Sequence, residues 1–371
     1  MKILILSDAG SSHTLKWVRS LSKAGIEIGL FSINKFDSTC YNDLYNVSLF
    51  GGCIDTEICN LPTNILKKVC YLKALPSLLK TIREFKPDIL HSHYISSYGV
   101  LGMLTCFRPH IVSVWGSDIF DFPKGNFLQK NLIKLCLKRA QKILSTSIVM
   151  AKETNLYTKK EVEVTPFGID LNTFKAKQVN SLFNEKDIVI GTVKTMSEKY
   201  GIKYLVKAFV KIKEKHPELP LKLLLVGGGE QSSEINKLII DSGIKDCSIM
   251  TGPVPYDKVS DYHNMLSVSV SVSNSESFGV AIIEASACEK PVVVSNVGGL
   301  PEVVENGITG IVVPPRDVDA TANAIEKLVL DKALREKMGK AGRERVKKLY
   351  DWNENVKQMI NIYRSVFEKK N

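Results

Sequence analysis

The sequence predicts an α/β protein with two domains, each built on a parallel sheet with helices on both faces. Its 371 residues exceed what one ordinary hydrophobic core organises. Short apolar runs typical of strands alternate with longer segments typical of helices, and this alternation favours parallel sheets. The alternation lapses in the polar, irregular stretch 165–187 and then resumes. That stretch is therefore predicted to connect the two domains.

The first domain opens with the apolar run 2–7, which Asp8 ends and which is predicted as a strand, not a signal peptide. His93 and Asp118 follow the ends of two later strands, where parallel sheets bind their ligands. His91 lies on the same strand face as His93, and a satisfied core histidine is its alternative. For Asp118 the alternative is capping of the next helix. The other predicted elements are strands at 26–32, 88–92 and 109–115, and helices at 12–24, 76–85 and 127–144.

In the second domain, the strand predicted at 266–273 leads into a polar loop that carries Glu276. A helix is predicted to begin near Phe278 or Gly279. Because the first N–H groups of a helix have no partners within the helix, and its dipole favours negative charge, this turn is a candidate phosphate site. Gly279 lets a ligand come close. The other elements predicted at the start of this domain are strands at 188–193 and 221–226 and a helix at 201–215.

Two carboxylates, Glu276 and Glu284, are separated by seven residues at this turn. A carboxylate accepts two hydrogen bonds from vicinal hydroxyls, so the pair suits a ligand with an anionic middle and a hydroxylated ring at each end. A nucleotide sugar is such a ligand. The alternative is that Glu276 caps the helix and Glu284 is a solvated helix residue.

Lys194 and Lys199 follow the strand 188–193 and are positioned to neutralise a diphosphate. Two unrelated surface lysines are the alternative. Gly228 lies in the glycine run after the strand 221–226. It either lets the backbone approach the nucleotide or makes a tight turn.

The net charge of +11 is concentrated in the first domain. Residues 1–165 contain 21 Lys and Arg and 13 Asp and Glu, or +8, against 29 and 26, or +3, in the remainder. The excess indicates an acidic partner: a phosphate-bearing acceptor, an anionic membrane face or nucleic acid. Nucleic acid is not expected, because aromatic and basic residues do not interleave. No run approaches the roughly 18 apolar residues of a membrane helix, so a cytoplasmic protein is expected.

Lysines recur every four residues along the helix predicted at 127–144, at Lys130, Lys134, Lys138 and Lys142. A solvated helix face is the default interpretation of such a stripe. Four lysines without nearby acids repel one another, however, which favours docking on an anionic membrane surface. Further cations, Lys67, Lys68, Lys73, Lys80 and Arg83, precede the stripe.

The segment SNSESFGVAIIEASACEKPVVVSNVGGLPEVVENGITGIVVPPRD, residues 273–317, resembles the donor-binding region of the retaining glycosyltransferases of family 4, marked by Glu, seven residues, Glu. The opening 7–32, the motif Pro166-Phe167-Gly168-Ile169-Asp170 and the tail from Tyr350 resemble the same family. The resemblance implies the GT-B fold, with two Rossmann-like domains facing across a cleft. The implied acceptor-binding domain is 1–165, with 352–371 crossing back to it; the linker is 166–186 and the donor-binding domain 187–351.

The resemblance also implies roles for the candidate residues: Glu284 for the ribose hydroxyls, Lys194 and Lys199 for the diphosphate, and Glu276 for the transferred sugar. The backbone around Phe278 and Gly279 would assist Glu276, and His93 and Asp118 would serve the acceptor side. Two positions depart from the family pattern. Trp115 stands where many members have a histidine that touches the sugar, and Lys194 stands where they have an arginine, which loses the bidentate fork but keeps the charge.

The sequence therefore predicts a retaining transferase that moves a hexose-type sugar from a UDP- or GDP-linked donor to a hydroxyl of a saccharide or lipid-linked saccharide. No other cofactor is expected. The pair Asp317 and Asp319 is interpreted as helix capping, so no obligatory metal is predicted. Assembly of surface polysaccharide or glycolipid is the expected setting, with the protein peripheral at the inner membrane face. The alternatives are a nucleotide-sugar epimerase on the same fold and a non-catalytic nucleotide-sugar-binding subunit.

Overall fold

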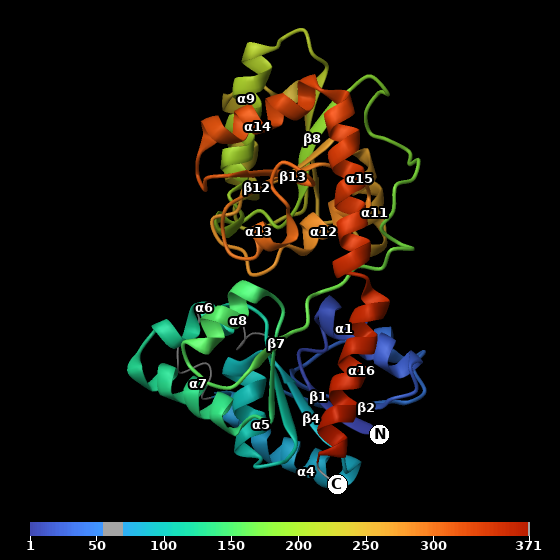
Figure 1. Cartoon of the computed structure of the whole chain (residues 1–371), viewed down its shortest axis with the longest axis vertical. Helices are drawn as coiled ribbons and strands as arrows, with labels where there is room; N and C mark the ends of the chain where they lie inside the picture. The colour runs from blue at the N-terminus through green and yellow to red at the C-terminus, as the bar shows by residue number, and fades with distance from the viewer. Residues whose placement is uncertain (55–69, 370–371) are drawn as a thin grey trace. The chain divides into compact units, whose positions relative to one another are not determined.

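The structure is a computed structural model that describes residues 1–54 and 70–369. The chain divides into two compact units: unit 1 is Met1–Pro166 with Glu354–Asn371, and unit 2 is Phe167–Asn353. Each unit has its own sheet flanked by helices (Figure 1). The stretch predicted as a linker packs with unit 2, where Ile169 and Phe174 are buried.

Unit 1 contains a seven-stranded sheet in the order β3-β2-β1-β4-β5-β6-β7, and neighbouring strands pair in parallel. Because the strand order reverses between β1 and β4, the carboxyl ends of these two strands form the topological switch point, where such sheets bind ligands. The strands are β1 (Lys2–Leu6), β2 (Glu27–Asn34), β3 (Val47–Ile54), β4 (Ile89–His93), β5 (His110–Val114), β6 (Lys142–Ser145) and β7 (Val162–Val164).

Helices and short helical turns connect these strands. The helices are α1 (Ser12–Lys23), α4 (Leu75–Phe85), α5 (Val100–Leu104), α6 (Ser117–Phe120), α7 (Phe127–Arg139) and α8 (Ile148–Asn155). The turns are η1 (Thr39–Tyr41), η2 (Tyr71–Ala74), η3 (Ile95–Gly99) and η4 (Phe122–Lys124). The last helix of the chain, α16 (Trp352–Glu368), joins unit 1 from Glu354 onward. Tyr363 of α16 anchors it to the sheet, because its hydroxyl hydrogen-bonds to Nδ1 of His91 at 2.7 Å.

Unit 2 contains a six-stranded sheet in the order β10-β9-β8-β11-β12-β13, again with parallel pairing. Its switch point lies between β8 and β11. The strands are β8 (Ile188–Val193), β9 (Leu221–Val226), β10 (Ser248–Gly252), β11 (Val268–Ser271), β12 (Val292–Ser295) and β13 (Gly310–Val313). The strand predicted at 266–273 is confirmed over its middle, Val268–Ser271. Val268, Val270 and Val272 all belong to the main core of the unit, although Val272 lies just after the strand.

The helices of unit 2 cover both faces of its sheet (Figure 1). They are α9 (Ile202–Lys215), α10 (Ser232–Asp241), α11 (Tyr256–Met265), α12 (Val280–Ala287), α13 (Leu300–Val303), α14 (Val318–Leu330) and α15 (Lys332–Leu349), with the turns η5 (Glu198–Tyr200) and η6 (Lys245–Cys247). Asp317 caps α14 by accepting a hydrogen bond from the backbone of Ala320 at 2.8 Å, as predicted for this position. Among the described helices, none combines the length and apolar character needed to cross a bilayer.

The helix predicted at 127–144 is wrong at its carboxyl end. α7 stops at Arg139, and the backbone N–H of Gln141 donates to the carbonyl of His110 at 2.8 Å, which brings the chain into the sheet. Lys142 therefore begins β6, where its ammonium pairs with Glu163 of β7 at 2.6 Å. The lysine stripe loses its fourth member, and Lys67 and Lys68 lie outside the described residues.

Candidate active site

Two charged side chains meet at the switch point of unit 2. Lys194 follows β8 and Glu276 lies in the loop after β11, so neighbouring strands bring both residues to one edge of the sheet. Nζ of Lys194 lies 2.5 Å from Oε2 of Glu276, and their side chains are 13% and 8% exposed. A pair this buried loses the solvation of both ions, so neither partner is easily removed without the other.

Tyr200 links the two candidate lysines. Nζ of Lys194 lies 4.4 Å from the centre of the Tyr200 ring, and Nζ of Lys199 lies 5.5 Å from the same ring. The carbonyl of Lys199 accepts the backbone N–H groups of Asn274 and Ser275 at 2.8 and 3.2 Å, which ties η5 to the loop that carries Glu276. Lys199 is exposed, whereas Lys194 is largely buried. Sequence reasoning did not single out Tyr200.

The backbone of Glu276 is fixed by the glycine turn before α13. Gly298 has a positive φ of 50°, and a Cβ at that position would lie 1.6 Å from the carbonyl oxygen of Glu276. The N–H of Gly299 donates to the same oxygen at 3.1 Å. Only glycine permits this approach, so Gly298 positions the loop.

The turn into α12 presents backbone, as predicted. Gly279 is the N-cap residue of the helix, with a φ of 107°, and it supplies no side-chain cap to the first N–H groups. The Phe278 ring is buried and packs edge-on against Phe167 and Tyr350, at 6.1 and 5.5 Å between ring centres. Phe278 therefore contributes only backbone to this turn. Glu276 does not cap α12: its Oε1 accepts the adjacent N–H of Ser277 at 3.2 Å.

Glu284 lies on α12 and is 6% exposed, which excludes the solvated alternative. Its Oε2 lies 3.3 Å from Nε2 of His263 on α11, so this nitrogen is placed to donate to the carboxylate. His263 is completely buried, and within the described part of the chain nothing hydrogen-bonds to its Nδ1. Sequence reasoning missed His263, because no local pattern connects it with Glu284.

Gly228 lies in a tight turn beside the Lys194 loop. Its carbonyl accepts the N–H of Met196 at 3.0 Å, while a Cβ on Gly227 would lie 2.2 Å from the carbonyl oxygen of Lys194. This packing accounts for Gly227 as a turn residue. The contact predicted between Gly228 and the nucleotide stays a prediction.

Two uncharged side chains, His93 and Ser7, meet at the switch point of unit 1. Nδ1 of His93, at the end of β4, lies 3.1 Å from Oγ of Ser7 after β1, and this hydroxyl bonds to Thr14 at 2.7 Å. Trp115 stacks on His93 with 4.4 Å between ring centres. Burial lowers the pKa of His93 to about 3, so the ring is neutral at physiological pH. These groups border a cavity of about 290 Å³ that Asp8 also lines.

His91 is a satisfied core residue. Besides its bond to Tyr363, its Nε2 lies 2.8 Å from Oγ of Ser113, and the side chain is fully buried. Its ring centre is 4.6 Å from that of His93, which confirms that the two residues share one face of β4. Of the two histidines, His93 lines the cavity and His91 does not.

Asp118 is not available to contact an acceptor, which corrects the prediction. Its side chain is fully buried, and its oxygens accept the backbone N–H groups of Ile95 at 2.8 Å, Gly116 at 2.7 Å and Trp115 at 3.2 Å. Nor does it cap the following helix, because these donors precede α6. The carboxylate fixes the loops after β4 and β5, and so positions Trp115 beside His93.

Comparisons with known proteins identify the family and the fold. The model of the family "Glycosyl transferase 4-like" matches residues 2–147, and that of "Glycosyl transferases group 1" matches residues 173–345. The capsular polysaccharide biosynthesis glycosyltransferase CapM of Staphylococcus aureus is 30% identical, over 85% of this chain and 88% of CapM. Sucrose-phosphate synthase from Thermosynechococcus elongatus has a TM-score of 0.83 at 22% identity, covering 100% of both chains. Anabaena HepE in complex with UDP and glucose has a TM-score of 0.78 at 19% identity, covering 98% of this chain and 100% of HepE.

The two Rossmann-like units and these structural matches define a protein of the GT-B type. The chain belongs to the group 1 glycosyltransferases, the family-4 class that its sequence resembles.

Proposed function

We propose that the protein transfers a hexose-type sugar from a UDP- or GDP-linked donor to an acceptor hydroxyl with retention of the anomeric configuration. The observation that carries this proposal is the buried ion pair between Lys194 and Glu276 at the switch point of unit 2. HepE, which shares the fold, has been crystallised with UDP-glucose and gives independent support for a nucleotide-sugar donor.

In this reaction, Lys194 and Lys199 neutralise the diphosphate, together with the first N–H groups of α12. Glu284, oriented by His263, accepts hydrogen bonds from the ribose hydroxyls. Glu276 faces an ammonium group, so it serves as a hydrogen-bond acceptor for the transferred sugar and not as a proton donor. With two lysines at the diphosphate, the leaving group needs no divalent cation, and we propose a metal-independent transferase.

The bond changes follow from the departing phosphate. The bond between the anomeric carbon and the phosphate oxygen breaks, the acceptor oxygen bonds to that carbon on the same face, and the acceptor proton passes to the departing phosphate. No side chain has to act as a covalent nucleophile. In unit 1, neutral His93 contacts the acceptor by hydrogen bonding and not as an ion.

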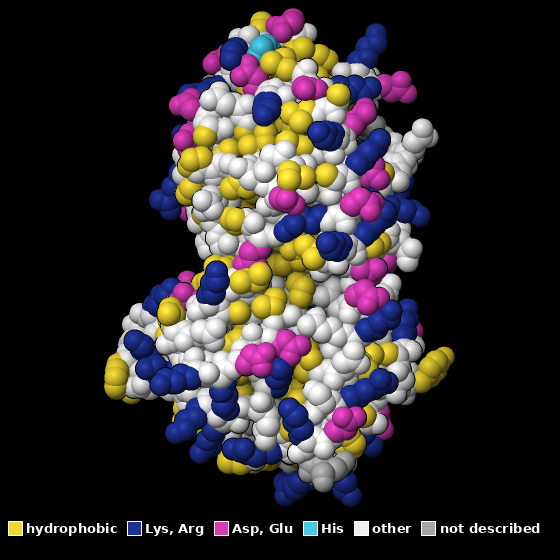
Figure 2. All heavy atoms as spheres, in the orientation of Figure 1, with side chains coloured by type: hydrophobic (Ala, Val, Ile, Leu, Met, Phe, Trp, Pro, Cys, Tyr) yellow, Lys and Arg dark blue, Asp and Glu magenta, His cyan; other side chains and the backbone are white. Residues whose placement is uncertain are grey.

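The proposed setting is surface polysaccharide or glycolipid assembly at the cytoplasmic face of a membrane, and the similarity to CapM supports it. Figure 2 shows dark-blue Lys and Arg side chains gathered over the part of unit 1 that carries α7. Lys130, Lys134 and Lys138 are exposed on this helix and form the basic face proposed to meet anionic lipid. Lys142 is excluded from it by its pairing with Glu163.

A thermal-shift screen with UDP, GDP, ADP and their sugar conjugates tests the donor site, because a ligand that binds the folded state raises Tm. We expect a shift with one nucleotide class that Glu284→Ala removes. NMR of the product with the matching donor should show the donor's anomeric configuration. Inversion would contradict the proposed mechanism, and an epimerised donor formed without acceptor would favour the epimerase.

A further inference from the structure

Tyr200, the last residue of the turn η5, contacts both lysines that are proposed to bind the diphosphate. Nζ of Lys194 lies 4.4 Å from the centre of its ring, and Nζ of Lys199 lies 5.5 Å from it. Both distances fall within the range of about 6 Å over which the negative face of an aromatic ring attracts a cation. The ring is half-buried and packs against the main core of unit 2, which holds it in place.

The backbone around this ring is also constrained. The N–H of Tyr200 donates to the carbonyl of Ser197 at 3.0 Å. Gly201, the next residue, has a positive φ of 61°, and a Cβ there would lie 2.4 Å from the carbonyl oxygen of Val272. Because only glycine permits this approach, η5 lies directly against the chain that leads from β11 to Glu276. Tyr200 is therefore a fixed surface beside the charged pair.

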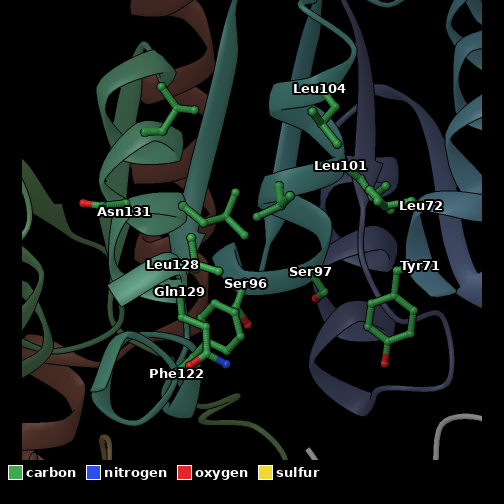
Figure 3. A pocket seen from close by; sticks show the side chains of 13 residues that line it. Tyr71, Leu72, Ser96, Ser97, Leu101, Leu104, Phe122, Leu128, Gln129 and Asn131 are labelled. Carbon is green, nitrogen blue, oxygen red and sulfur yellow. The ribbon is translucent and has the colours of Figure 1, made fainter. Parts of the chain in front are cut away.

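Aromatic rings in a large pocket of unit 1 have different surroundings. Figure 3 shows Tyr71 and Phe122 at an apolar pocket of about 540 Å³, together with leucines such as Leu101. The described residues that line this pocket are all uncharged. Tyr200 differs from these rings, because two ammonium groups lie over it.

The two ammonium groups are compensated unequally. Lys194 pairs with Glu276 at 2.5 Å, whereas for Lys199 no ion pair is found within residues 1–54 and 70–369. A long exposed side chain loses rotamer freedom when it binds a ligand, and this loss weakens the binding. Contact with the fixed ring of Tyr200 restricts Lys199 before the ligand arrives, so less freedom remains to be lost.

We propose that Tyr200 is a positioning residue of the donor site, whose ring holds the ammonium groups of Lys194 and Lys199 in place for the diphosphate. The inference rests on the proposed function, because it takes these two lysines as the groups that bind the diphosphate. A carboxylate at this position would also hold the lysines, but it would cancel their charge and repel the ligand. The ring is uncharged, so it restrains the ammonium groups and leaves their charge available.

The following helix provides a matched control. Tyr204 is also half-buried against the same core, and Nζ of Lys203 lies 5.5 Å from the centre of its ring. Lys203 pairs with Glu198 at 2.8 Å and is not a candidate for the diphosphate. Tyr200→Leu and Tyr204→Leu therefore remove the same kind of ring and the same kind of cation contact from one core. Tyr200→Phe keeps the ring and removes only the hydroxyl.

The probes are UDP and GDP, each compared with its nucleoside in calorimetric titrations at constant ionic strength. Tyr200→Leu should weaken binding of the nucleoside diphosphate that the wild-type chain prefers about three- to tenfold. Nucleoside binding should change less than about twofold, because only the diphosphate meets the ammonium groups. Tyr200→Phe and Tyr204→Leu should bind the diphosphate within about twofold of wild type. Urea unfolding should show similar losses of stability for the two leucine variants.

Equal losses of nucleoside and nucleoside diphosphate binding in Tyr200→Leu would overturn the proposal, since the ring would then be structural only. An equal loss of diphosphate binding in Tyr204→Leu would also overturn it, as would Tyr200→Phe binding as weakly as Tyr200→Leu. A wild-type chain that binds neither UDP nor GDP contradicts both the proposed donor site and this inference. Normal diphosphate binding in Tyr200→Leu contradicts only the role of Tyr200.

Discussion

The two units share one strand order over six strands but place different kinds of chemistry at the switch point. In unit 2 the strand ends bring together an ammonium and a carboxylate, Lys194 and Glu276, at 2.5 Å. In unit 1 the corresponding ends bring together a hydroxyl and a neutral imidazole, Ser7 and His93, at 3.1 Å. Topology therefore places a site, whereas the residues after each strand decide whether it suits a diphosphate or a hydroxylated acceptor.

The largest expected effect comes from removing the negative charge of Glu276 in unit 2. Glu276→Gln leaves the ammonium of Lys194 without its partner in a buried site, which should cost about 3–5 kcal/mol in the free energy of unfolding. Transferase kcat should fall about 10²–10³-fold, because the sugar loses its charged contact. Urea unfolding and steady-state kinetics measure the two effects.

The control is the double variant Lys194→Met with Glu276→Gln. It removes both charges, so it should recover most of the lost stability without recovering activity. Recovery of activity as well would mean that the pair is structural only, and the contrast with unit 1 would lose its functional meaning.

Acid should destabilise unit 1, because its buried histidines resist protonation in the folded state. Burial lowers the pKa of His93 to about 3, that of His110 to about 4, and that of His91 well below its ordinary value. In the unfolded chain the pKa of a histidine is about 6.5. Below this pH the unfolded chain binds protons that the folded unit does not, so the free energy of unfolding decreases. From pH 6 to pH 5 the loss should approach about 3–4 kcal/mol for the three histidines.

Hydrogen exchange read by mass spectrometry at pH 6 and pH 5 separates the units. Unit 1 should lose protection before unit 2, and His110→Gln should reduce the loss by about a third. Equal loss of protection in both units would refute the assignment of this pH dependence to the three histidines.

A smaller effect is expected from Glu284, the second carboxylate of unit 2. Glu284→Gln keeps the shape but weakens two charge-assisted hydrogen bonds, so KM for the donor should rise about 10–100-fold with little change in kcat. His263→Gln should give part of this rise, since it removes the group that orients the carboxylate. A loss confined to kcat would place Glu284 at the reacting carbon instead of at the ribose.

The smallest expected effect is that of metal removal. If lysines supply the positive charge at the diphosphate, EDTA should change the rate less than about twofold, since no cation acts as Lewis acid. Initial rates with EDTA and after addition of Mg²⁺ or Mn²⁺ provide the measurement. A rate that depends on either cation would show that Lys194 and Lys199 do not suffice.

Much of the architecture follows from local pattern. Alternating valines such as Val268 and Val270 mark a buried strand, and parallel strands carry the residues after them to one edge of the sheet. For this reason, the proximity of Lys194, Lys199 and Glu276 could be predicted from the sequence alone. The sequence also identified the group 1 family. It also placed His93 at the corresponding edge of the first domain.

Only the tertiary structure decided which groups touch. Gly298, 22 residues after Glu276, fixes the backbone of that glutamate. His263 contacts Glu284 from another helix. The carboxylate of Asp118 is occupied by hydrogen bonds from backbone N–H groups. Lys142 is not part of the lysine stripe, because its segment forms β6 and pairs with β5. Local periodicity specifies the face on which a side chain lies, whereas its partner depends on loops that fold back from distant parts of the chain.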